Sequence, residues 1–266
     1  MVPLTKKEEW FLVKLKEEDF EVLRGPIDSG RQSPANLAFV LILGIFLQAL
    51  LFALEYYMAA DSTIYPYKDE IVTIHFWITV VLIALSLIYA IPAVYKRSEK
   101  VQYLISIIVT QNMSSIPFLI MALFLIGKDG EGMIASPDSL LSFTYIVLLI
   151  GFLVFLATFI RFYILLKNGH YRKGSKKGEM RGRFETTSYI PSSIIAGVGI
   201  VFIIQYIVRN SAINDLNVII LIVGGILAFF VMLFILPEQL VILYCKYRYK
   251  SFNFNERSYI NKRQYN

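Results

Sequence analysis

The chain has 266 residues, of which 56% are hydrophobic and only 17% are charged, and its mean hydropathy is +0.59. Soluble domains carry about 25% charged residues, so this composition indicates an integral membrane protein. The single cysteine, Cys245, excludes both a disulfide framework within the chain and a thiolate cage for a metal ion.

The first 35 residues form a charged leader that is too small for a catalytic domain. In residues 11–22, apolar and charged residues alternate on both sides of an acidic turn, which favours a short hairpin. The alternative is a helix capped by Thr5, because Glu8 follows at the spacing of a capping box. The first apolar stretch begins too late for a cleaved signal peptide, so we expect the chain's own helices to hold it in the membrane.

Six apolar stretches are each long enough to cross a hydrocarbon core, which needs about 20 residues. In chain order they are 36–59, 70–94, 101–126, 139–166, 190–208 and 216–245. We therefore predict an all-α polytopic integral membrane protein with six transmembrane helices. The expected parts are a leader at 1–35, a transmembrane domain at 36–245 and a basic, aromatic tail at 246–266.

Lys and Arg are concentrated in four of the segments outside the predicted helices. Of the 26 Lys and Arg residues, 22 lie in the leader, the second loop, the fourth loop and the tail. The other three loops hold only Lys68, Lys128 and Arg209. Because cytoplasmic segments carry the excess of Lys and Arg, we predict that both termini are cytoplasmic. The compact loops and the residue usage favour a bacterial cytoplasmic membrane.

The fourth loop is basic and rich in glycine. Gly169 and Gly174 have the spacing of P-loop glycines, but Ser175 stands where that motif needs a lysine. We interpret the loop as a solvated cationic segment near anionic headgroups. The tail alternates aromatic and basic residues at a helix exit, which is typical of an interfacial anchor, so we expect no binding of nucleic acid.

Polar residues recur on one face of four predicted helices. In lipid such residues are costly and usually face the protein interior, where they form helix contacts or functional sites. The stripes are Gly44, Gln48 and Glu55; His75, Thr79 and Ser86; Gln102, Ser106, Thr110, Gln111 and Ser114, with Asn112 and Ser115 alongside; and Ser193, Gly197 and Gln205. For the Ser and Gly positions we favour helix packing over a pathway.

The predicted topology assigns the ionisable residues to two depths. Glu55, His75 and Gln205 come from three helices and share an outer depth, so they form a candidate outer polar layer. A carboxylate close to a histidine favours the protonated ring, and histidine changes charge near neutral pH. We therefore place the working site in this layer.

Arg161 and Glu238 form a candidate inner ion pair. They are the opposite charges that share an inner depth, and an unpaired charge there would be costly. We expect them to pair or to share a water-filled vestibule. Pro117 and Pro237 each remove a helical hydrogen bond, so we predict helix kinks at both.

The sequence contains no recognisable catalytic or metal-binding motif, which favours a non-enzymatic protein without a cofactor. The plan of the chain, which is a short charged leader, six spans and a basic tail, favours a self-immunity protein that binds a membrane-active toxin. The alternatives are the permease subunit of an exporter with a separate ATPase chain, and a small proton-coupled carrier based on Glu55 and His75. A catalytic role for that pair is a further alternative. The expected partners are the lipid bilayer and a toxin or an ATPase subunit.

Overall fold

The computed structural model describes residues 15–61, 63–128, 136–176, 178–180, 216–255 and 260–261. Within these ranges the regular elements are helices. Isolated β-bridges pair Thr63 with Lys128 and Phe254 with Ile260. The elements are η2 (Glu17–Arg24), α1 (Gly25–Asp28), α2 (Pro34–Leu54), η3 (Glu55–Ala60), α3 (Lys68–Ala90), α4 (Pro92–Tyr95), α5 (Glu99–Ser114), α6 (Ile116–Ile126), α7 (Pro137–Lys167), α10 (Leu216–Arg248) and η4 (Lys250–Phe252).

Five helical segments of the described chain are long and apolar enough to cross a membrane. They are Pro34–Ala60, Lys68–Ala90, Glu99–Ile126, Pro137–Lys167 and Leu216–Arg248. These segments correspond to five of the six predicted spans, so the predicted helices are confirmed there, and the structure is consistent with a helical membrane protein. The remaining span, 190–208, lies outside the described residues, as do Ser193, Gly197 and Gln205.

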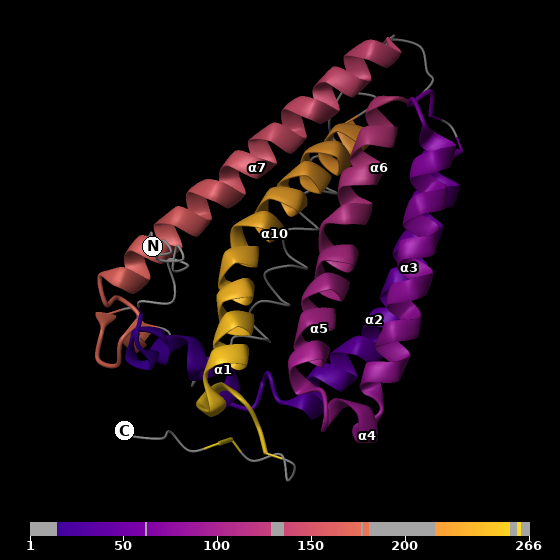
Figure 1. Cartoon of the computed structure of the whole chain (residues 1–266). Helices are drawn as coiled ribbons and strands as arrows, with labels where there is room; N and C mark the ends of the chain where they lie inside the picture. Colours follow the sequence, from indigo (N-terminus) through magenta and orange to yellow (C-terminus); the bar gives the residue numbers. More distant parts are fainter. Residues whose placement is uncertain are drawn as a thin grey trace, which may run out of the picture.

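The bundle has two groups of helices that share α5 and α6 (Figure 1). On one side α2 packs against α3 and α5. On the other side α10 packs against α6, α7 and α5. Both α2 and α7 begin with a serine, Ser33 or Ser136, whose hydroxyl accepts a backbone N–H of the first turn, followed by a proline. This is the preferred start of a helix, because the serine satisfies an orphan donor and the proline needs none.

The third apolar segment is interrupted near its proline. α5 ends at Ser114 and α6 starts at Ile116, with Ser115 between them at φ −130° and ψ −62°. Pro117 then lies in the first turn of α6, where its missing N–H leaves no hydrogen bond unmade. α10 continues through Pro237, and Figure 1 shows that this helix bends along its length. The assignment of that bend to Pro237 stays a prediction.

α7 and α10 run in the same direction. A Cβ added at Gly151 would meet Phe229 and Leu233, and further along both helices Arg161 and Glu238 line one pocket. Residue numbers therefore rise together along this helix pair. As a result, α7 ends and α10 begins at opposite ends of the bundle (Figure 1).

The described part of the leader is helical, so the predicted hairpin is wrong there. Residues 17–28 form η2 and α1 at the place of the predicted turn and second strand. Phe20, Leu23 and Ile27 are fully buried. Their spacing is that of one helical face, and burial of this face outweighs the local alternation. Thr5, the cap of the alternative helix, lies outside the described residues.

We call η2, α1, residues 169–173 and residues 249–254 the end cap. The backbone N–H of Val22 donates to the carbonyl of Tyr171 over 2.9 Å, and Arg172 Nε lies 2.7 Å from Asp19 Oδ1. Tyr171 is buried. The start of the fourth loop is thus packed against the leader through Tyr171, whereas its basic residues Arg172, Lys173 and Lys176 are exposed.

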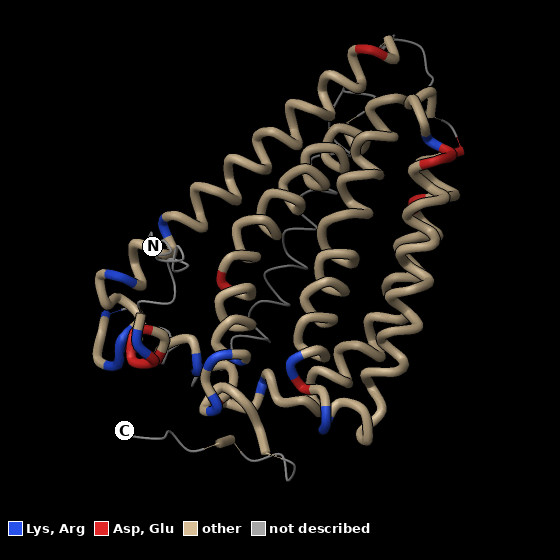
Figure 2. Tube along the Cα trace, viewed as in Figure 1, with Lys and Arg blue, Asp and Glu red and all other residues tan. Residues whose placement is uncertain are grey.

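The tail closes the same end of the bundle. The hydroxyl of Tyr249 donates to the carbonyl of Leu15 over 3.1 Å, and Phe252 is fully buried. Burial raises the pKa of the Tyr249 phenol to about 12, so this group stays a donor at neutral pH. The leader, the fourth loop and the tail therefore share one core, at the end of the bundle where Lys and Arg gather (Figure 2).

The contact between α6 and α10 gives a stability test. A Cβ at Gly225 would lie 2.5 Å from the carbonyl oxygen of Phe118, whereas one at Gly224 would meet no described atom within 4 Å. Gly225→Ala should lower the melting temperature of the purified protein, because overpacking costs about 1–3 kcal/mol. Gly224→Ala should leave it unchanged or raise it slightly, since alanine favours a helix. Equal melting temperatures of the two variants would contradict the close approach.

Candidate functional site

A connected set of buried polar side chains joins α2, η3, α3 and α5. Glu55 Oε2 lies 2.7 Å from His75 Nδ1, and His75 Nε2 lies 3.3 Å from Asn112 Oδ1. Asn112 Nδ2 donates to Gln48 Oε1 over 3.1 Å and to Thr79 Oγ1 over 3.3 Å. Each of these five residues is at most 3% exposed. We call them the polar network.

Helix geometry brings these side chains together. Gln48 and Glu55 are seven residues apart, and His75 and Thr79 are four apart, so each couple lies on one helical face. Gly44 stands one turn before Gln48, where an added Cβ would lie 3.2 Å from Val109 Cγ1 of α5. The absence of a side chain at Gly44 therefore lets α5 approach α2.

The amide of Asn112 sets the protonation pattern of His75. Because Asn112 Nδ2 donates to two oxygens, its Oδ1 faces His75 as an acceptor, and His75 Nε2 must then carry a hydrogen. This orientation follows from the hydrogen-bond network, as amide assignments do. The exchangeable proton of the network is therefore the one between His75 Nδ1 and Glu55.

The contact between Glu55 and His75 is close but poorly aligned. Its 2.7 Å distance is that of an ion pair, yet neither oxygen of Glu55 has an aligned hydrogen bond to a described residue. At this distance opposite charges on the two side chains attract each other whatever the direction of the N–H bond. The other oxygen, Glu55 Oε1, also has no donor among the described residues, so the carboxyl can accept a proton. With one shared proton the pair is neutral, and without that proton it carries one negative charge.

Glu55 is also the first residue of a π-helical turn, η3. Such turns are rare and occur mostly as single turns at functional sites. At the far end of η3, Lys68 Nζ donates to the carbonyl of Ala60 over 3.3 Å. The Glu55–His75 pair therefore lies about two helical turns, roughly 10 Å, from the end of the α2–α3 hairpin at which η3 stops and α3 begins.

A pocket lies beside the network on the surface of α2, η3 and α3. It has a volume of about 450 Å³ and is lined by Phe52, Ala53, Tyr56, Tyr57, Val72, Thr73 and Phe76. We call it the aromatic pocket. The ring centroid of Phe52 lies 5.7 Å from that of His75. Phe52 therefore contacts the network and lines the pocket at the same time.

The structure brings together two of the three residues of the predicted outer layer, Glu55 and His75, while Gln205 lies outside the described residues. Arg161 and Glu238 of the predicted inner pair line a second pocket, of about 390 Å³, with Thr158, Phe162, Leu165, Tyr171 and Pro237 among its other residues. Their direct ion pair stays a prediction.

The polar stripe of α5 makes mainly backbone contacts. Gln102 Nε2 donates to the carbonyls of Pro34 and Tyr89, over 2.9 and 3.0 Å, and so ties α5 to the start of α2 and the end of α3. The hydroxyls of Ser106 and Thr110 donate to carbonyls of their own helix. Gln111 Nε2 reaches the Met232 carbonyl on α10 at 3.5 Å, and Ser114 is the last residue of α5. These contacts are typical of helix packing.

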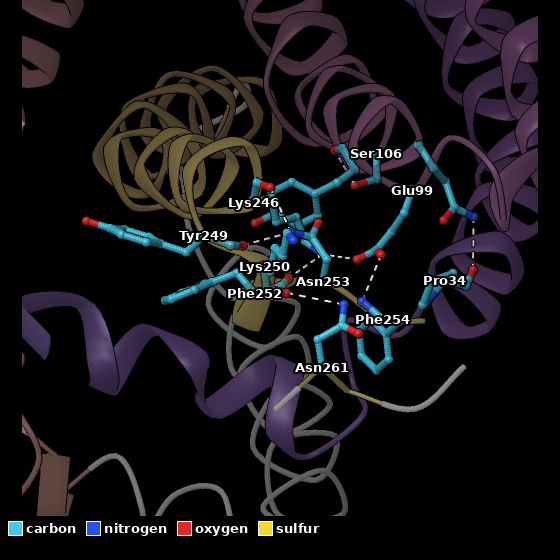
Figure 3. Close-up of polar contacts among 12 residues, drawn as sticks. Pro34, Glu99, Ser106, Lys246, Tyr249, Lys250, Phe252, Asn253, Phe254 and Asn261 are labelled. Atoms are coloured by element: carbon cyan, nitrogen blue, oxygen red, sulfur yellow. Dashed lines mark hydrogen bonds and ion pairs between the residues drawn. The ribbon is translucent and has the colours of Figure 1, made fainter. Parts of the chain in front are cut away.

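The sequence reasoning missed a second buried polar cluster, at the junction of α5, α10 and the tail (Figure 3). Lys246 is fully buried; its Nζ pairs with Glu99 Oε1 and donates to the Phe252 carbonyl over 3.1 Å. Glu99 Oε2 accepts the backbone N–H of Phe254 over 2.9 Å, and Asn253 Nδ2 donates to the Lys246 carbonyl over 2.8 Å. The cluster fastens the tail to the bundle.

Comparison with family models, curated proteins and solved structures finds no match for this chain. Glu55 and His75 are potential metal ligands, but the described residues contain no group of three His, Cys, Asp or Glu side chains that could hold an ion. What the network can do with its own atoms is bind and release one proton.

The Lys246–Glu99 pair gives a test of the cluster in Figure 3. Lys246→Met leaves the Glu99 carboxylate unpaired, and Glu99→Gln leaves a buried ammonium without its counter-charge. Each change should destabilise the protein by about 3 kcal/mol. The double variant should lose clearly less than the sum, as measured by unfolding in detergent. Lys250→Met, at an exposed lysine, is the matched control. Simple additivity would remove the coupling.

Proposed function

We propose that this protein is a small proton-coupled carrier and that the Glu55–His75 pair binds the coupling proton. The observation that carries the proposal is the 2.7 Å contact between two almost fully buried ionisable side chains inside apolar helices. Ionisable groups at such depth are costly, and they commonly mark proton relays and transport sites. A purely structural contact between these helices needs no exchangeable charge.

The remaining polar network supports this role. Asn112 fixes the hydrogen on His75 Nε2, so that only Nδ1 and the Glu55 carboxyl exchange a proton. Gain or loss of this proton changes the charge of the site by one unit. Such a change biases helix packing around the pair, because an uncompensated charge in a low-dielectric interior is unfavourable. The proposed cycle involves no enzymatic step and no cofactor.

We further propose six spans, with both termini in the cytoplasm of a bacterial cell. α7 ends and α10 begins at opposite ends of the bundle, so the chain between them has to connect the two ends (Figure 1). Lys and Arg gather at the end that holds the end cap (Figure 2), which supports placing this end in the cytoplasm. The Glu55–His75 pair then lies nearer the outer surface.

The self-immunity role and the permease-subunit role rest on the plan of the chain. No contact among the described residues favours either of them over a carrier. Both remain alternatives that a transport measurement separates from the proposal, because neither requires the protein alone to move protons with a solute.

The carrier role is tested in proteoliposomes that contain a pH-sensitive dye. A panel of organic cations, amino acids and sugars is added outside, and proton movement is recorded. At least one solute class should drive proton movement in the wild type, and Glu55→Gln and His75→Ala should abolish it in protein that remains folded, as its melting curve shows. His170→Ala, at the exposed second histidine, is the control and should keep full activity.

Two results would contradict the carrier role. The first is solute flux at the wild-type rate in Glu55→Gln. The second is the absence of proton movement with every solute of the panel. If the protein also protects cells against a membrane-active toxin, the immunity role is favoured. Stoichiometric co-purification of an ATPase would instead favour the permease subunit.

The topology is tested with reporter fusions. Fusions after Lys100, Lys177 and Lys250 should report the cytoplasm, because they follow the basic segments. Fusions near Asp61, Asp129 and Asn210 should report the exterior. A cytoplasmic signal at Asp129 would overturn the six-span arrangement.

A further inference from the structure

The aromatic pocket and the buried acid next to it form a site for a positively charged ligand. We infer that this pocket binds a lipophilic organic cation, which is the substrate that exchanges with the proton. The inference rests on the proposed carrier function and adds the substrate class. Four aromatic rings, a carboxylate without an aligned donor and an acidic rim carry it.

The four rings surround the pocket from both helices. Phe52, Tyr56 and Tyr57 come from α2 and η3, and Phe76 comes from α3. The centroid of Phe52 lies 6.4 Å from that of Tyr56 and 5.4 Å from that of Phe76, and Tyr56 and Tyr57 meet edge to face at 5.0 Å. The faces of such rings attract cations, and ring cages recognise quaternary ammonium groups.

The charges near the pocket have the matching sign. Glu55 does not line the pocket itself; its partner His75 lies behind the ring of Phe52, and Glu55 Oε1 has no hydrogen-bond partner among the described residues. Asp69 lies one turn before Thr73 on the same face of α3, and Asp61 and Glu70 are exposed at the same end of the hairpin. Lys68, the cation of this rim, donates to the Ala60 carbonyl.

The pocket opens on the exposed flank of the α2–α3 hairpin. Tyr57 is 75% exposed and Phe76 is 42% exposed. Exposed apolar side chains, Met58 and Trp77, follow Tyr57 and Phe76 in the chain, so we expect a ligand dissolved in the bilayer to reach the pocket sideways. The volume of about 450 Å³ lies within the range of small-molecule sites, roughly 300–1,000 Å³. A compact cation with apolar substituents fits both the size and the entry route.

Charge balance links this ligand to the proton. The pair with its shared proton is neutral, and it offers no net attraction to a cation. Loss of that one proton leaves one negative charge behind Phe52, which then attracts one monovalent cation. Binding of the cation and binding of the proton therefore exclude each other, one for one.

Isothermal titration calorimetry of the detergent-purified protein tests the inference. The probes are tetraphenylphosphonium and tetraphenylborate, which have the same shape and opposite charge. The cation should bind at least tenfold more tightly than the anion. Phe76→Leu should weaken cation binding about two- to thirty-fold, the range expected for one lost ring contact. Glu55→Gln should weaken it at least tenfold and leave the borate unaffected.

The matched control is Phe46→Leu, at a lipid-facing phenylalanine of α2 that is 69% exposed and lies outside the pocket. This variant should bind the cation like the wild type. No cation binding, equal binding of both probes, or equal losses in the Phe46 and Phe76 variants would overturn the inference and would indicate a site for lipid or for neutral apolar molecules.

The same titration separates this inference from the proposed function. The titration is repeated in two buffers with different enthalpies of ionisation. If each bound cation releases one proton, the observed binding enthalpies should differ by the difference between the two ionisation enthalpies. Selective cation binding that depends on Phe76 but releases no proton would keep the binding site and contradict the proton coupling. Absence of cation binding in a protein that moves protons with another solute would leave the carrier and remove the cation.

Discussion

The structure depends on one constraint of the bilayer, namely that a buried charge must find its partner inside the protein. Glu55 and His75 meet this constraint with a 2.7 Å contact between α2 and α3. Asn112 then ties α5 to the same contact, and Gln48 and Thr79 complete its hydrogen bonds. Three helices are thus held in register by a site whose charge depends on one proton.

The two ends of the bundle solve this problem differently. Next to the end cap, Lys246 of α10 pairs with Glu99 of α5, and each side chain has a further contact to a backbone group of the tail. This arrangement fastens the tail and gives the proton no free acceptor. At the other end, Glu55 keeps an oxygen without a donor among the described residues and borders an aromatic pocket. The first cluster is suited to stability, and the second is suited to exchange.

Composition was enough to predict the apolar helices, because bilayer thickness restricts their length, and the helix directions placed Glu55 and His75 at one depth. Their 2.7 Å contact needed the structure. The hairpin was wrong since burial of Phe20, Leu23 and Ile27 on one helical face depends on partners far away in the chain. Lys246 was counted only among the basic residues of the tail, and its pairing with Glu99 needed three-dimensional contacts. Asn112 was one of several polar residues on α5, and helical spacing alone did not distinguish it.

Nitrogen NMR of histidine tests the central claim most directly. The chain has two histidines, so in a His170→Gln background every ¹⁵N-histidine signal comes from His75. The account predicts that Nε2 carries a hydrogen in the wild type and that the Nδ1 signal changes in Glu55→Gln, because Nδ1 faces the Glu55 carboxyl. An Nε2 without a hydrogen, or an Nδ1 signal that is identical in the wild type and in Glu55→Gln, would contradict a proton shared by the pair.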